Sequence, residues 1–168
     1  MPKIIENLKE KLIAEATAQL RSAGYEATTV RSVAKACGVG VGTVYNYFPS
    51  KDQLIAACML QSWQSCIASI NKTAEKADTS APVARCIFDQ LQSYTHDHQF
   101  LFRDKKAVAV FAGSFGKYHA LLRSQLAEPF HKFSQNEFTC EFAAEALLTW
   151  TMNGKSFEEI YNILKKIF

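Results

Sequence analysis

The chain has 168 residues, of which 48% are hydrophobic, a size and composition that suit one or two compact domains and exclude a disordered chain. Nineteen Lys and Arg against sixteen Asp and Glu give a formal charge of +3, so the chain is only mildly basic. If it binds a nucleic acid, it has to do so through a local basic patch. No run of about 18 apolar residues occurs, which excludes a membrane-spanning helix. The N-terminus lacks a signal-peptide core, and we expect a cytoplasmic protein with no membrane contact.

Apolar residues recur at three- and four-residue steps through most of the chain, which is the period of an amphipathic helix. Four Pro and seven Gly are too few for the turns of a β-sandwich. The pattern therefore predicts an all-α fold of about nine helices. The first three helices are expected at about Lys3–Ala23, Val30–Cys37 and Val41–Tyr47. Gly24 stops the first of them, and Pro49 ends the third because proline cannot continue the backbone ladder.

A long fourth helix follows the capping box formed by Ser50 and Gln53. The polar stretch Asn71–Ser80 is the only linker-like segment, and Pro82 begins the fifth helix. The last helix begins with a second capping box at Ser156. The four helices after the fifth are expected at about 104–111, 118–130, 138–150 and 156–167.

Cysteine usage is typical of a reducing compartment, because the thiols are odd in number, widely scattered and never spaced as C-x-x-C. We expect them to be small apolar core residues. A thiol sensor is the alternative, and it requires a lowered thiol pKa that a sequence does not reveal. The five cysteines are Cys37, Cys58, Cys66, Cys86 and Cys140.

Two short helices joined by a glycine-containing turn, after a longer helix, fit a helix-turn-helix. Val33, Ala34 and Val44 can form the small core that fixes the two short helices at a steep angle. Ala34 has to be small because the second of these helices crosses close to it. The outer face of that helix then presents Thr43 and Asn46, and such a helix can enter the major groove of DNA.

The residues of this segment form a specific pattern. It reads Gly24-Tyr25-Glu26-Ala27-Thr28-Thr29-Val30, Val33-Ala34, Cys37-Gly38-Val39, Gly42-Thr43-Val44-Tyr45-Asn46-Tyr47-Phe48, Ser50-Lys51 and Leu54. From about Leu12 to Ala57 the chain thereby resembles the TetR/AcrR family of bacterial transcriptional regulators. The resemblance implies a DNA-binding domain at 1–49 and a helical ligand-binding and dimerisation domain at 50–168. One departure is Gly40, where this family often has a serine that caps the recognition helix.

The resemblance also implies a homodimer that reads a palindromic DNA operator, and it assigns residues to that contact. Thr43, Tyr45 and Asn46 lie on the recognition helix, whereas Thr28, Thr29, Tyr47 and Lys51 would contact phosphates and Arg31 reaches backbone or base. Packing in the domain core is an equal alternative for Tyr45 and the expected place of Phe48. No Arg or Lys lies between Val39 and Pro49, so the usual guanine contact is missing from this helix. The full expected set is Thr28, Thr29, Arg31, Gly42, Thr43, Tyr45, Asn46, Tyr47 and Lys51.

Aromatic residues are dense in the C-terminal part, where the resemblance implies a pocket for a small effector, expected to be apolar or aromatic. At helical spacing, any one of these aromatics is more often a core residue than a ligand contact. The candidate pocket residues are Trp63, Phe88, Tyr94, Phe111, Phe115 and Trp150. The last two helices are expected to form the four-helix bundle of the dimer. Their candidate residues are Phe138, Phe142, Leu147, Trp150, Ile160 and Leu164.

The leading interpretation is a ligand-responsive repressor that acts as a homodimer. The runner-up is a helical small-molecule-binding dimer that has lost specific DNA binding. An enzyme is not expected, because the sequence has no nucleophile elbow, phosphate loop or HExxH signature. The four histidines have no metal-ligand spacing, so we expect neither a metal nor another cofactor. They are His96, His98, His119 and His131.

Overall fold

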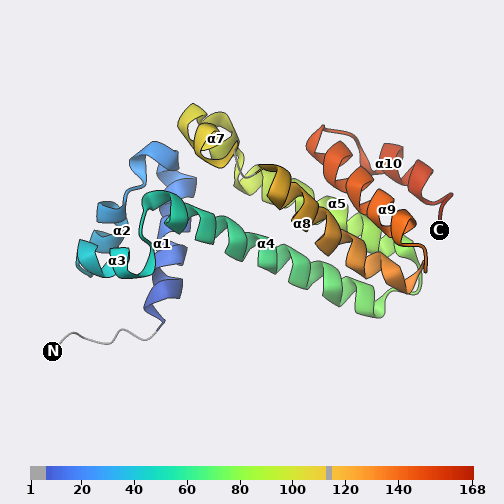
Figure 1. The fold of residues 1–168 in the computed structure, drawn as a ribbon, viewed down its shortest axis with the longest axis horizontal. Helices are drawn as coiled ribbons and strands as arrows, with labels where there is room; N and C mark the ends of the chain where they lie inside the picture. The colour runs from blue at the N-terminus through green and yellow to red at the C-terminus, as the bar shows by residue number, and fades with distance from the viewer. Residues whose placement is uncertain (1–6, 113–114) are drawn as a thin grey trace. The chain divides into compact units, whose positions relative to one another are not determined.

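The computed structural model describes residues 7–112 and 115–168, and all regular structure within these ranges is helical, which confirms the all-α prediction. None of the helices in these ranges is long and apolar enough to cross a membrane. The elements are α1 (Leu8–Ala27), α2 (Val30–Ala36), α3 (Val41–Tyr47), α4 (Lys51–Lys76), α5 (Ser80–Asp97), α6 (Gln99–Arg103), α7 (Lys105–Ala112), α8 (Phe115–Ala127), the 3-10 helix η1 (Glu128–Lys132), α9 (Glu137–Met152) and α10 (Phe157–Leu164) (Figure 1).

The chain divides into two compact units. The first comprises the described part of Met1–Ser62 together with Asp97–Val110, and the second comprises Trp63–His96 with Phe111–Phe168. This division differs from the expected boundary between residues 49 and 50 in two respects. The first unit extends along α4 as far as Ser62, and it also includes α6 and most of α7.

Local signals set the helix boundaries of the first unit. Gly24 has φ of 82° and ψ of 179°, so regular helix stops there as predicted, and one further turn follows before α1 ends. Thr29 caps α2: its Oγ1 accepts from the Ser32 N–H at 3.0 Å, while Ser32 Oγ accepts from the Thr29 N–H at 2.9 Å. Gly38, with φ of 67°, makes the turn into α3, whose bounds are those predicted.

The core of the first unit is small and built from short side chains. Val33 and Ala34 of α2 and Val44 of α3 are all buried, and the two helices contact each other. Ala34 is almost without exposed surface, which agrees with the predicted close crossing of the two short helices. This core fixes which face of α3 points outward.

The second unit has a larger core, formed by apolar residues of α4, α5, α8, α9 and α10 with the aromatic ring of Phe130. Lys132 binds the C-terminal end of α4 next to this core. Its Nζ donates to the carbonyl oxygens of Ala74 at 3.1 Å and Ala77 at 2.6 Å, at the C-terminus of α4. A cation in this place satisfies helix carbonyls that have no partner in the next turn.

Some predicted boundaries were wrong. The stretch Asn71–Ser80 is not a linker, because α4 continues through Lys76 and only 77–79 separate it from α5. Ile70 and Ala77 are buried in the core on either side of the polar residues, so packing keeps this segment helical. The sequence pattern also did not predict α6 or η1 as separate elements.

Candidate nucleic-acid interface

The outer face of α3 is exposed in the pattern predicted for a recognition helix. Val44 is fully buried, and Phe48 after the helix is also buried, which confirms its expected core position. Tyr45 and Tyr47 are 48% and 44% exposed, and Asn46 between them is exposed as well. The alternative of a core position for Tyr45 is therefore not what the structure shows. α3 thus presents a row of polar and aromatic side chains to solvent.

The start of α3 has no side-chain cap. Gly40 is its N-cap residue, with φ of −70° and ψ of 147°, and no side chain accepts from the first N–H groups. Gly42 and Thr43 form the first turn, where Gly42 is exposed and Thr43 is half-buried. A bare first turn lets the backbone approach a DNA strand closely.

The two threonines before α2 lie in different environments. Thr28 is only 1% exposed, and its Oγ1 donates to the Gly24 carbonyl oxygen at 2.8 Å. Its hydroxyl is therefore turned into the domain, away from the phosphate contact that was expected of it. Thr29 is exposed, and its hydroxyl belongs to the α2 cap.

Lys51 is turned toward α1. Its Nζ donates to the carbonyl oxygens of Tyr25 and Glu26 and lies 4.0 Å from the centre of the Tyr25 ring. The Tyr25 hydroxyl in turn donates to Asp52 Oδ1 at 2.6 Å. These contacts tie the first turn of α4 to the end of α1, so Lys51 is a structural clamp as well as a candidate phosphate contact. Burial lowers the pKa of Lys51.

The Tyr25 phenol is expected to ionise at a higher pH than an ordinary tyrosine does. Burial, and then its hydrogen bond to Asp52, raise its pKa from 10.0 to about 12. Because the unfolded chain loses this proton near pH 10 and the folded chain only near pH 12, the phenol's contribution to folding stability falls as the pH rises through that window. The absorbance of phenolate during an alkaline titration checks this, with Tyr25→Phe as the control. A Tyr25→Phe difference curve centred near pH 10 would contradict it.

The first unit also carries basic side chains on α1, α2 and α7. Arg31 is exposed on α2, and Lys35 is exposed one turn later, a spacing of four that the sequence could have revealed. Lys106 forms an ion pair with Glu26 at 2.5 Å. Arg21 forms another with Asp97 at 3.2 Å. The last two pairs join residues far apart in sequence, and no local signal predicts them.

The expected pocket residues whose side chains the structure describes lie in different environments. Trp63 and Tyr94 pack edge to face with ring centres 5.5 Å apart, and Trp63 Nε1 donates to Gln125 Oε1 at 2.6 Å. Phe88 is buried against Phe157, whereas Trp150 is exposed. The side chains of Phe111 and Phe115 lie outside the described residues.

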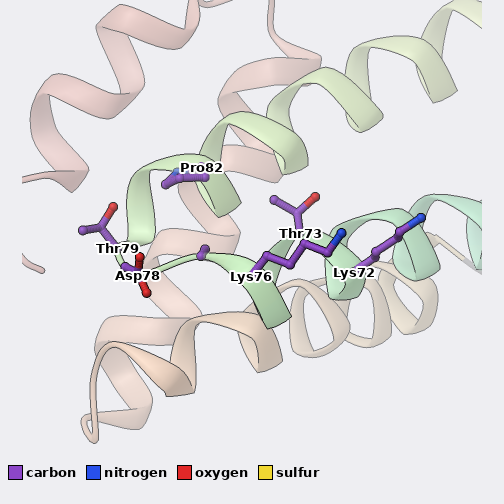
Figure 2. Close-up of a pocket in the computed structure, with 7 residues that line it drawn as sticks. Lys72, Thr73, Lys76, Asp78, Thr79 and Pro82 are labelled. Atoms are coloured by element: carbon purple, nitrogen blue, oxygen red, sulfur yellow. The ribbon is translucent and has the colours of Figure 1, made fainter.

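A surface hollow of about 500 Å³ lies where α4 ends and α5 begins. Figure 2 shows that α4 contributes lysines and a threonine to it, while Asp78 and Thr79 come from the connection and Pro82 from α5. Its lining is Lys72, Thr73, Lys76, Ala77, Asp78, Thr79 and Pro82, and includes no expected pocket residue.

The described cysteines favour core positions over a sensor. Burial raises the pKa of the Cys37, Cys58 and Cys140 thiols, which disfavours the reactive thiolate. Cys37 lies at the turn of the helix-turn-helix, where its Sγ donates to the Lys11 carbonyl oxygen at 3.8 Å.

Comparison with known proteins decides the family of this domain. Residues 12–58 match the model of the bacterial regulatory proteins of the tetR family. The chain carries the DNA-binding domain of the TetR family. The TetR-family match begins within α1 and ends in the second turn of α4, so it contains α2, α3 and Lys51.

The curated relatives match this chain mainly through the same domain. The HTH-type transcriptional repressor KstR of Rhodococcus jostii (strain RHA1) is 42% identical over 57 residues, which are 33% of this chain and 27% of KstR. The nucleoid occlusion factor SlmA of Actinobacillus pleuropneumoniae serotype 5b (strain L20) is 34% identical over 64 residues, 38% of this chain and 32% of SlmA. In these alignments the chain spans about a third or less of the length of its curated relatives.

Solved structures share the fold over nearly the whole chain. RolR, crystallised without ligand, aligns with a TM-score of 0.61 and 18% identity over 94% of this chain and 89% of RolR. The superantigen PfiT aligns with a TM-score of 0.56 and 23% identity over 96% of each chain. FadR from Bacillus subtilis, solved with stearoyl-CoA, aligns with a TM-score of 0.54 and 17% identity over 94% of this chain and 96% of FadR. At these identities the likeness concerns the fold alone.

Proposed function

We propose that this chain is a transcriptional regulator, most simply a repressor, that binds double-stranded DNA as a homodimer with α3 in the major groove. The observation that carries the proposal is the exposed face of α3, with Tyr45, Asn46 and Tyr47 opposite the buried Val44. The TetR-family match of residues 12–58 supports it.

The chemistry of the exposed residues divides them into two groups. Asn46 can form the paired hydrogen bonds that an amide makes with the major-groove edge of adenine, and Thr43 can contact a thymine methyl group. Tyr47, Arg31 and Lys35 suit phosphates, which position the protein without reading sequence. Because α3 has no cation, the rest of the specificity would depend on DNA shape.

The dimer belongs to the same proposal, with a face that keeps part of the expected one. Of the predicted interface residues, Leu147, Ile160 and Leu164 are buried within the chain's own core and are not free to meet a partner. In contrast, Phe138 and Phe142 on α9 are 72% and 43% exposed, with ring centres 6.2 Å apart. We therefore place the dimer contact on the outer face of α9 and the adjoining part of α8.

The spacing of that face supports a helix-packing role. Phe138, Phe142, Glu145 and Thr149 follow one another at steps of four, three and four residues, which is the seam of a coiled coil or four-helix bundle. We call these four residues the α9 seam. A second copy would cover its two phenylalanines, which otherwise face water.

Response to a small apolar or aromatic effector is the remaining part of the proposal. The aromatic residues of the second unit support it, and the related fold of FadR was solved with stearoyl-CoA. α4 has residues in both units, so it is the element through which a ligand-dependent change could reach the DNA-binding unit.

Selection of bound duplexes from a random DNA pool, at a stated salt concentration, tests the proposal. We expect enrichment of a palindrome with half-sites about one helical turn apart or somewhat more. Absence of enrichment by a folded, dimeric protein would overturn it in favour of a small-molecule-binding dimer without specific DNA binding.

Replacing Arg31 by Ala is expected to weaken binding to all duplexes by a similar factor and to reduce the salt dependence of the affinity. If the guanidinium neutralises one phosphate, the slope of log affinity against log salt should decrease by about 0.9. Fluorescence anisotropy over a salt series measures this. Lys72→Ala is the matched control, because it removes the same charge from the second unit. An unchanged slope for Arg31→Ala would count against the phosphate contact.

A further inference from the structure

A cluster of charged side chains lies across α8 and α9, next to the α9 seam. α8 contributes His119 and Arg123, and α9 contributes Glu141 and Glu145. Glu145 belongs to the seam itself, one turn after Phe142. All four side chains are only partly exposed, between 29% and 40%. The basic members of the cluster are therefore on one helix and the acidic members on the other.

The ion pairs within the chain are loose. Arg123 lies 3.9 Å from Glu141 and 3.9 Å from Glu145, distances too long for hydrogen bonds. Arg123 Nε and Glu145 Oε2 are buried and have no hydrogen-bond partner within the described residues. Glu145 Oε1 accepts from Thr149 Oγ1 at 2.6 Å and lies 3.6 Å from His119 Nε2. These two buried atoms are out of reach of a partner, but the Arg123 side chain is 37% exposed and, in the part of the chain that the structure describes, its Nη atoms have only the long ion pairs, so its guanidinium keeps donors that an acceptor on another chain can reach.

A two-fold dimer would use this capacity. In such a dimer both copies use the same surface. If α8 of the first copy lies against α9 of the second, then α8 of the second copy lies against α9 of the first. Arg123 would then face acidic side chains of the second copy, and both contacts would join opposite charges. A polar residue in a helix-packing seam is a known means of fixing register and partner.

We propose that Arg123, Glu141 and Glu145 select the partner, so that the α8 and α9 face accepts a second copy of this chain and rejects chains without the complementary charges. This inference rests on the proposed homodimer and adds the basis of its selectivity. Phe138 and Phe142 supply the apolar contact, which discriminates poorly between partners. The charges supply the discrimination, because like charges brought together there are costly.

Charge exchange between the helices tests the proposal. The triple variant Arg123→Glu, Glu141→Arg and Glu145→Arg keeps opposite charges next to each other within the chain, so it should fold and dimerise with itself. Mixed with the wild type, it would place like charges together at both contacts. We expect mixed dimers at least about tenfold below the statistical share of one half, measured by native mass spectrometry after subunit exchange. Mixing at the statistical share would overturn the proposal, because charges paired only within each chain do not discriminate.

Two half-variants give an independent readout. Arg123→Glu alone and the pair Glu141→Arg with Glu145→Arg should each dimerise poorly alone, and together they should form a mixed dimer in which both contacts are satisfied. Failure of the mixture to dimerise, with both chains folded by circular dichroism, would also contradict the proposal. Lys72→Glu is the control for a charge reversal elsewhere in the second unit and should mix freely with the wild type. A monomeric wild type would instead remove the proposed homodimer, which is a distinguishable result.

Discussion

Phe142→Glu is expected to convert the dimer into a monomer and to reduce operator affinity by a factor of about 10² to 10⁴. Phe142 is an exposed member of the α9 seam, so a carboxylate in its place would have to be buried without a partner when two copies meet. The affinity falls because a monomer binds one half-site and loses the high effective concentration of the linked second domain. Sedimentation equilibrium measures the first effect, and fluorescence anisotropy on the selected duplex measures the second.

Ile163→Glu is the matched control for this change. Ile163 is 59% exposed on α10, the helix that the sequence predicted to take part in the dimer. If the face lies on α9 as proposed, Ile163→Glu stays dimeric and binds DNA normally. A monomeric Ile163→Glu together with a dimeric Phe142→Glu would return the interface to the last helix.

Phe130→Ala is expected to lower the free energy of unfolding by about 3–5 kcal/mol. Phe130 lies in η1 with no exposed surface, at the centre of the second unit's core, and its ring stacks on that of Phe168 at 5.1 Å. Removing the ring loses its apolar burial and leaves a cavity that the packed helices fill only in part. Domains of this size are stable by about 5–15 kcal/mol, so much of the total is at stake.

Chemical denaturation followed by circular dichroism measures the loss. Phe168→Ala removes the stacking partner, whose own ring is partly exposed, and should cost no more than about 1.5 kcal/mol. Equal losses for the two variants would show that the stacking contact, rather than burial in the core, determines the contribution of Phe130.

The helix-turn-helix could be predicted almost to the residue because its boundaries depend on local chemistry. Gly24 and Gly38 take positive φ values that favour glycine, and Thr29 caps α2 through the residues next to it. The buried face of α3 followed from the helical period, which placed Val44 inward and Asn46 outward. The same local logic located the capping box of Ser156 at the start of α10.

Features that depend on contacts between distant segments could not be predicted in this way. Local polarity suggested a linker after Asn71, but core packing on both sides keeps the chain helical there. The buried hydroxyl of Thr28 and the turn of Lys51 toward α1 are results of packing that no spacing rule reveals. Leu147 is a further example: it was expected at the dimer interface but is buried in the core of its own chain. Periodicity identifies an apolar helix face, but it does not say whether that face packs within the chain or against a second copy.

The selected DNA motif of Asn46→Ala, compared with that of the wild type, tests the central claim that the outer face of α3 reads bases. The proposal predicts that Asn46→Ala loses preference at one position in each half-site, worth about 1–3 kcal/mol of discrimination, while the other positions stay as they are. Tyr47→Phe, which removes only a hydroxyl assigned to phosphate, should bind more weakly and keep the wild-type motif. An Asn46→Ala motif identical to that of the wild type would contradict the claim.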